Sequence, residues 1–288
     1  MKYKFISEYR SRFRISKMCA VLGVSRNGYY TWLKRTPGRR AQENQVLLHE
    51  IRIIHEQSHQ TYGSPRTAKE LQRRGYKCSR PRVARLMSKN NIYAKTKRKF
   101  KVTTHSKHNY KISPNLLEHM TQVDNLYQFW ASDITYIRTK AGWLYLTVIM
   151  DVYNRQIVGW SMSNRLTAST TTIPALLQAY KRHHPPEGLI FHSDRGVQYA
   201  CDAFRKYLSK FNITQSMSGK GHCYDNALSE SFFHTLKTEL VYFEKYETRE
   251  QARTSIFRYI EIFYNRQRLH SSLGYRTPVE YGNLKNAA

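Results

Sequence analysis

The chain has 288 residues, and its 40% of hydrophobic and 13% of aromatic residues are enough for folded cores and too many for a disordered protein. It carries 48 Lys and Arg against 20 Asp and Glu, a formal net charge of +28, which predicts a polyanionic partner, nucleic acid before a membrane surface. Four scattered cysteines without a Cys-x-x-Cys pair disfavour a disulfide framework and a zinc site, and no signal peptide or long apolar stretch is present; we therefore expect a cytoplasmic, nucleoid-associated protein.

The pattern of residues 1–36 predicts a helix-turn-helix. A short amphipathic helix ends before Gly23, and Ser25 can cap a second helix through its hydroxyl. In this motif the second helix enters the major groove, so Arg26 and Tyr30 on that helix are predicted to contact DNA. A plain helical hairpin is the alternative, which the strong positive charge disfavours.

Residues 41–92 predict a second helical DNA-binding domain. Its first helix spans about 43–58, its second begins with Ser64 as the cap and stops at Gly75, and its third is capped by Ser79. Four basic side chains of this domain are predicted to bind DNA: Arg66, Arg80, Arg82 and Arg85.

A basic linker follows at 93–124, and its Lys97, Arg98 and Lys99 are predicted to bind phosphate without sequence preference. Residues 1–120 hold 28 Lys and Arg against only 6 Asp and Glu, so the positive charge is concentrated in the N-terminal part. That part is therefore predicted to hold DNA, whereas the remainder has the charge balance of an ordinary globular domain.

From about residue 125 the pattern changes to alternating strand and helix signals. Strands are predicted at about 130–138, 143–153, 156–161, 189–193 and 213–217, and helices at about 167–182, 199–211, 226–241 and 249–265. Asn154-Arg155 is the expected turn between the second and third strands. This order predicts an α/β fold with a ribonuclease-H-like catalytic core, a mixed five-stranded sheet with helices, at 125–245. Residues 246–288 are expected to complete that core, which the all-α helix-turn-helix units precede.

Three carboxylates fall where such a core would gather them. Asp133 lies within the first strand, Asp194 follows the fourth, and Glu230 begins a long helix, with 35 residues between the last two. A lone Asp is unusual in a strand, which makes Asp133 the best single indicator. Asp194 alone is also compatible with a turn, and Glu230 with a favourable charge at a helix N-terminus.

Together, three converging carboxylates predict a metal-dependent phosphoryl-transfer site. Hard divalent cations prefer oxygen ligands and keep positions open for waters and substrate phosphates. Two such ions, about 3.5–4 Å apart, can stabilise the attacking and leaving oxygens of an in-line displacement.

Several sequence runs carry a family resemblance that covers nearly the whole chain. They are Trp130–Ile137, His192–Tyr199, Tyr224–Phe233 and Tyr264–Tyr275, with Tyr62–Arg66 and Arg82–Met87 in the N-terminal half. With these runs the chain resembles the catalytic protein, encoded by the second open reading frame, of bacterial transposases of the "insertion sequence three" group. These are Asp-Asp-Glu enzymes related to retroviral integrases.

The resemblance implies that Asp133, Asp194 and Glu230 are the catalytic residues and hold two Mg²⁺ or Mn²⁺ ions. It implies a DNA transposase that binds terminal inverted repeats and catalyses strand cleavage and strand transfer, with water and then a DNA 3′-hydroxyl as nucleophiles. Lys237, two helical turns after Glu230, is implied to touch the transposon end. The implied partners are double-stranded DNA of the transposon ends and target, a second copy of the chain, and the product of the first open reading frame.

Secondary contributors are less sharply defined. His192 is two residues before Asp194 and is either close to the metals or a hydrogen-bonded core histidine; Asn226 is a helix cap or a ligand. Asp151, at the end of the second strand, is expected to be structural and is the natural substitute if one of the three acids is misassigned.

Three rival functions remain open at this point. A hybrid ribonuclease would share the acids but would not need the helix-turn-helix units. A non-enzymatic DNA-binding regulator would leave the spacing of the acids unexplained. A tyrosine recombinase would form a covalent bond to DNA without metal, and four residues suggest it: Arg266, Arg268, His270 and Tyr275.

Overall fold

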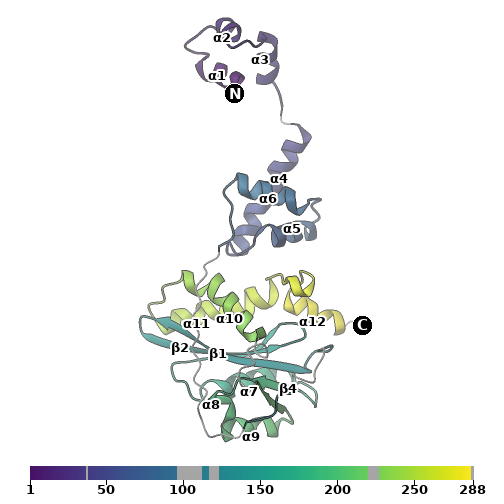
Figure 1. The fold of residues 1–288 in the computed structure, drawn as a ribbon, viewed down its shortest axis with the longest axis vertical. Helices are drawn as coiled ribbons and strands as arrows, with labels where there is room; N and C mark the ends of the chain where they lie inside the picture. Colours follow the sequence, from purple (N-terminus) through teal and green to yellow (C-terminus); the bar gives the residue numbers. More distant parts are fainter. Residues whose placement is uncertain (37, 96–111, 117–122, 220–226, 287–288) are drawn as a thin grey trace.

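The structure is a computed structural model that describes residues 1–36, 38–95, 112–116, 123–219 and 227–286. A small N-terminal helical unit, a second helical unit and an α/β core follow one another along the long axis of the molecule (Figure 1). Of the predicted contacts, Lys97, Arg98, Lys99 and Asn226 lie outside the described residues. Within the described ranges, no helix has the length and apolar character needed to cross a membrane.

The N-terminal unit is a three-helix bundle whose last two helices form the predicted helix-turn-helix. Its helices are α1 (Lys2–Tyr9), α2 (Ile15–Val21) and α3 (Arg26–Leu33). The Ser25 hydroxyl accepts a hydrogen bond from the Gly28 amide at 2.8 Å, which confirms the predicted cap. Helix α1 was not predicted; it contributes Ile6 to a small core that also contains Met18 and Tyr29.

The second helical unit contains α4 (Arg39–Gln57), α5 (Ser64–Arg73) and α6 (Arg80–Lys89). The cap at Ser79 is confirmed, since its hydroxyl accepts a hydrogen bond from the Arg82 amide at 3.4 Å. The cap predicted at Ser64 is wrong: Gly63 occupies the cap position and Ser64 is already helical, with the fixed φ of Pro65 within the first turn. Helix α4 also begins earlier than predicted, because nothing after Gly38 interrupts the helical backbone.

The core is built on the predicted mixed five-stranded sheet. Its strands are β1 (Phe129–Thr139), β2 (Gly142–Asp151), β3 (Ile157–Ser163), β4 (Ile190–Ser193) and β5 (Thr214–Met217). They lie in the order β3-β2-β1-β4-β5, antiparallel among the first three and parallel from β1 to β5. The turn between β2 and β3 is where it was expected, and Arg155 takes a positive φ of 61° there. The ribonuclease-H-like prediction is thus confirmed.

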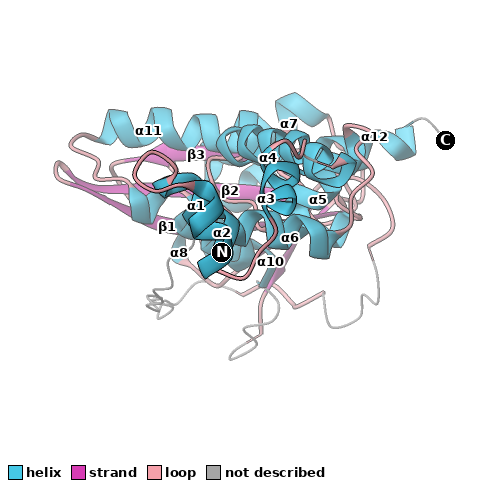
Figure 2. Cartoon of the chain, turned by 90° about the horizontal axis from the view of Figure 1, so that it is seen from above, coloured by secondary structure: helices cyan, strands magenta, loops and turns pink. Residues whose placement is uncertain are grey.

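Helices cover both faces of this sheet (Figure 1), and in the view from above helices lie over the strands (Figure 2). One layer consists of α7 (Thr172–His183), α8 (Val197–Ala200) and α9 (Asp202–Lys210), and the other of α10 (Ala227–Glu239), α11 (Arg249–Arg258) and α12 (Pro278–Asn286). The single helix predicted at 199–211 is divided at Cys201, whose ψ of 149° is extended. The helix predicted at 249–265 changes to π-helical turns at Tyr259–Tyr264.

The alternation of side chains in β2 divides the core into two clusters. Leu146 and Val148 pack with α10 and α11, whereas Ile149 packs on the opposite face with α7. The α10 cluster continues into the second helical unit, and Tyr62 joins the two. The Tyr62 hydroxyl donates to the Gln267 carbonyl at 3.0 Å and accepts from the Leu269 amide at 2.8 Å. This helical unit therefore packs against the C-terminal part of the chain.

Candidate active site

The sheet register brings Asp133 and Asp194 together. Ser132 of β1 and Ser193 of β4 are register partners in parallel strands, and each precedes one of the two aspartates. Because side chains alternate along a strand, Asp133 points to the same face as Ile137, which packs in the cluster containing α10. The two carboxylates therefore meet beside that helix.

Short hydrogen bonds hold both carboxylates in place. Asp133 Oδ1 accepts from the Ile134 amide at 2.7 Å, and Asp194 Oδ1 accepts from the Gly196 amide at 2.9 Å. A Cβ added at Gly196 would lie 2.9 Å from that same oxygen of Asp194. Glycine at 196 therefore allows the tight turn in which Asp194 is held.

Helix α10 supplies the third acid and a cation. Glu230 lies in its first turn and is exposed, and Lys237 follows seven residues later on the same face. Burial lowers the pKa of Lys237, while the Asp133 carboxylate acts to raise it. Lys237 is therefore within electrostatic range of Asp133.

The electrostatics of Asp133 link all four residues. The pKa of Asp133 is raised to about 8, chiefly by burial and next by the Asp194 carboxylate; Glu230 contributes in the same direction, whereas Lys237 opposes them. Carboxylates so close to one another cannot all remain ionised unless a cation compensates them, and without one Asp133 keeps its proton at neutral pH. The carboxylate oxygens and their mutual repulsion therefore fit hard divalent cations.

The coordination shell is not closed in this structure. Across the described ranges, no group of three or more His, Cys, Asp or Glu residues already has the arrangement of a metal site. The acids share an electrostatic environment, and the residues just before α10, 220–226, lie outside the described part of the chain.

The secondary candidates His192 and Asp151 are both buried and hydrogen-bonded. His192 has no exposed surface, and its ring nitrogens lie 2.8 Å from the Ser216 hydroxyl and 3.2 Å from the Ser218 hydroxyl. Asp151 accepts hydrogen bonds from the Tyr127 and Tyr153 amides, and burial raises its pKa to about 6. Both side chains therefore stabilise the ends of strands.

The predicted DNA contacts divide into exposed and internally paired side chains. Four are exposed on α3 and α6: Arg26, Tyr30, Arg80 and Arg85. In contrast, Arg82 donates to Asn44 at 2.9 Å and pairs with Glu43 at 3.1 Å. Arg66 lies 3.7 Å from Glu239 and over the ring of Tyr62. These two arginines thus make contacts within the chain that the sequence patterns did not predict.

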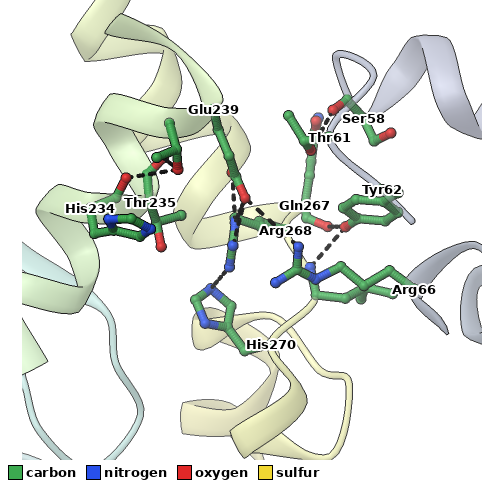
Figure 3. A network of polar contacts seen from close by, with 12 residues as sticks. Ser58, Thr61, Tyr62, Arg66, His234, Thr235, Glu239, Gln267, Arg268 and His270 are labelled. Atoms are coloured by element: carbon green, nitrogen blue, oxygen red, sulfur yellow. Dashed lines mark hydrogen bonds and ion pairs between the residues drawn. The ribbon is translucent and has the colours of Figure 1, made fainter. Parts of the chain in front are cut away.

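A buried ion pair at the end of α10 was also missed (Figure 3). Arg268 is only 5% exposed and donates to Glu239 through Nε at 2.9 Å and Nη2 at 2.7 Å. Glu239 accepts a further hydrogen bond from the Tyr259 hydroxyl at 2.8 Å. The helical spacing of Ser231, Thr235 and Glu239 is a signal that one polar face of α10 has a partner.

Comparisons with known families agree with this architecture. The "Integrase core domain" family matches residues 125–223, a second "Integrase core domain" family matches residues 230–285, and the "HTH-like domain" family matches residues 41–100. Among solved structures, a simian T-cell lymphotropic virus intasome in complex with a PP2A regulatory subunit matches with a TM-score of 0.46 and 15% identity, over 80% of this chain and 73% of that one. The catalytic core domain of BIV integrase matches with a TM-score of 0.43 and 18% identity, over 56% and 97%.

Curated relatives match over the full length. "Transposase InsF for insertion sequence IS3A" of Escherichia coli (strain K12) is 42% identical over 290 residues, 100% of both chains. The "Insertion element IS600 uncharacterized 31 kDa protein" of Shigella sonnei is 44% identical over 264 residues, 92% of this chain and 97% of that protein. Because these identities extend over whole chains, with the helix-turn-helix-like and integrase core families in the same order, the chain belongs to the IS3 family of insertion-sequence transposases.

Proposed function

We propose that Asp133, Asp194 and Glu230 are the catalytic residues of this transposase and hold two divalent ions, Mg²⁺ or Mn²⁺. The observation that carries the proposal is the adjacency of Asp133 on β1 and Asp194 directly after the parallel strand β4, with Asp133 in electrostatic contact with Asp194 and with Glu230 and Lys237 of α10. When bound, the ions would stabilise charge on the attacking and leaving oxygens of a phosphodiester.

The residues of the chain position DNA for two successive displacements. In the first, a water oxygen attacks phosphorus at the transposon end and the 3′ oxygen leaves as a hydroxyl. In the second, that 3′-hydroxyl attacks a phosphodiester of the target and displaces another 3′ oxygen. Each step forms one phosphorus–oxygen bond and breaks one, so that no ATP is needed. The electrostatic interaction of Lys237 with Asp133 supports a role for its ammonium group in contacting the phosphate at the transposon end.

The contacts of the residues that suggested a tyrosine recombinase give that function less support. A recombinase arginine must reach the scissile phosphate, but Arg268 is committed to Glu239 inside the protein. The Lys69 ammonium lies over the ring of Tyr275, and its nitrogen is 5.7 Å from the ring centroid. These contacts favour a metal-dependent mechanism without a covalent protein–DNA intermediate.

We further propose that the terminal inverted repeats are held by the two helical units and that the protein acts as at least a dimer. The exposed Arg26 of α3 and Arg85 of α6 support the first point. The second rests on the chemistry, since two transposon ends must be held together for coordinated joining. The product of the first open reading frame is the other expected protein partner.

The function is tested by incubating the full chain and Mg²⁺ with duplexes carrying the terminal inverted repeats of its element. Nicked ends and joined strands are expected with the wild type and neither product with Asp133→Asn. Joined products from Asp133→Asn at the wild-type rate would refute the assignment of that residue.

A further inference from the structure

A small polar cavity lies next to the proposed active site, and the proposed mechanism does not use it. The cavity has a volume of about 170 Å³ and lies between the turn after β2, helix α10 and the segment that follows the π-helical turns. Three guanidinium groups line it, those of Arg66, Arg155 and Arg268, and no acidic side chain is among its described lining residues. Two of these arginines and His270 are drawn in Figure 3.

The positive charge around the cavity is only partly compensated. Glu239 pairs with Arg268 at 2.7 Å and lies 3.7 Å from Arg66, so one carboxylate serves two guanidinium groups. Arg155 is half-buried and has no ion-pair partner in the described part of the chain. Burial lowers the pKa of Arg155 and of Arg66, a sign that their charges are costly where they stand.

His270 does not relieve this excess. Burial and the charges of Arg268, Arg66 and Arg155 hold its pKa well below the usual range, so the ring is neutral. Its Nε2 lies 3.4 Å from Arg268 Nη1 and accepts from that donor. Three arginines and one glutamate therefore leave a net charge of about two positive units, a state that an anionic ligand would stabilise.

The remaining lining groups suit a tetrahedral oxyanion. Hydroxyl donors are supplied by α10, through Ser231 and Thr235, and by Ser271 and Ser272 at the exposed side of the cavity. Guanidinium and hydroxyl groups together are the usual ligands of phosphate. A volume of about 170 Å³ leaves room for one phosphate group.

We propose that this cavity binds one backbone phosphate of the DNA that the transposase acts on. The inference rests on the proposed function, because it places the phosphate beside the catalytic helix. Ser231 directly follows Glu230, so α10 presents one face to the acids and the neighbouring face to the cavity. A phosphate held there fixes the DNA strand relative to Glu230.

The experiment uses the full chain in metal-free buffer, with inorganic phosphate as the first probe. Sodium phosphate is compared with sodium chloride at equal ionic strength, and the thermal unfolding midpoint is measured. The thermal unfolding midpoint of the wild type is expected to rise by ~3 °C at saturating phosphate. Arg155→Gln, which keeps the unbranched stem and removes the charge, should lose this gain. Ser271→Asp, an exposed substitution that places a carboxylate at the cavity, should also lose it.

The second probe is a duplex DNA, whose binding is measured as a function of salt concentration. Loss of one phosphate contact should reduce the slope of log K against log salt by about 1 in Arg155→Gln. Arg182→Gln is the charge-matched control, because Arg182 lies on α7 at the opposite face of the sheet, and it should retain both the phosphate gain and the slope.

Two outcomes would overturn the inference. One is an undiminished phosphate gain in Arg155→Gln or Ser271→Asp. The other is a phosphate gain that depends on Arg155 without a change in the DNA slope, which would assign the cavity to free phosphate. Asp194→Asn should retain the phosphate gain and lose cleavage; continued cleavage by that variant would count against the proposed function and leave the cavity result standing.

Discussion

Asp133 and Asp194 lie side by side because the serines before them pair across β1 and β4. Neither strand alone forms a site: Asp133 directly follows the buried first half of β1, and Asp194 is held in a tight turn by the Gly196 amide. Their adjacency explains why the Asp194 carboxylate helps to raise the pKa of Asp133.

The first prediction is a pH-dependent stability effect of Asp133→Asn without divalent ions. The folded-state pKa of Asp133, about 8, lies above its unfolded value of ~3.9, so folding favours the protonated acid. The resulting stabilisation is present at low pH and is lost as the pH rises through about 8. Between the unfolded and folded pKa values, the free energy of unfolding of the wild type should fall by up to ~1.4 kcal/mol per pH unit relative to that of Asp133→Asn.

Urea unfolding in EDTA at pH 5 and pH 8.5 measures this difference. Glu187→Gln, at an exposed carboxylate that precedes β4 and so lies beyond the opposite end of that strand from Asp194, should track the wild type at both pH values. An equal stability difference between Asp133→Asn and wild type at both pH values would contradict the raised pKa of Asp133.

The second prediction concerns the buried pair of Glu239 and Arg268. Arg268→Gln leaves the Glu239 carboxylate with weaker partners in a buried environment, and such losses typically cost about 3–5 kcal/mol. Lys140→Gln breaks an exposed pair with Glu247 at 2.8 Å and should cost less than ~1 kcal/mol. Denaturant unfolding compares the two variants; equal losses would mean that the buried pair contributes no more than a surface pair.

The third prediction concerns the packing of α7 on β3. A Cβ at Gly159 would lie 2.5 Å from the Ala175 carbonyl oxygen and 2.7 Å from the Ala179 Cβ. Gly159→Ala should therefore push the helix from the sheet and destabilise the fold by about 1–3 kcal/mol. Gly38→Ala is the control, because nothing lies within 4 Å of its added Cβ. A thermal midpoint for Gly159→Ala at or above that of Gly38→Ala would be inconsistent with this close contact.

The fourth prediction separates exposed arginines from paired ones. Arg85→Gln on α6 should weaken duplex binding and reduce the salt slope by about 1 if that exposed side chain contacts a phosphate. Arg82→Gln, three residues earlier, removes contacts to Asn44 and Glu43 and should chiefly lower stability. Fluorescence anisotropy titrations at several salt concentrations test both; an unchanged slope for Arg85→Gln would remove that residue from the DNA interface.

Local patterns in the sequence predicted the elements that depend on neighbouring residues. The caps at Ser25 and Ser79, the turn at Arg155 and the strand containing Asp133 all follow from short-range chemistry, and the mixed five-stranded sheet was predicted from the order of the elements. The predicted cap at Ser64 failed because Gly63 and Pro65 together determine where that helix begins.

The sequence patterns did not predict ion pairs between residues that lie far apart along the chain. Glu239 and Arg268 are 29 positions apart, and Arg66 reaches the same carboxylate from another helical unit. Arg155 was recognised only as a turn residue, although its side chain lines a cavity with two distant arginines. Such convergence depends on how the second helical unit packs against the C-terminal segment, which no periodicity encodes.

We propose that Asp133, Asp194 and Glu230 carry out strand cleavage and joining without a covalent protein–DNA intermediate. The most direct test of this proposal is a denaturing gel of end-labelled transposon ends after reaction with the wild type, Asp133→Asn, Asp194→Asn and Glu230→Gln in Mg²⁺. We expect cleaved and joined DNA free of protein with the wild type, and no product with any of the three variants despite near-normal DNA binding. Wild-type amounts of joined product from any variant, or a labelled protein–DNA adduct that resists denaturation, would contradict this mechanism.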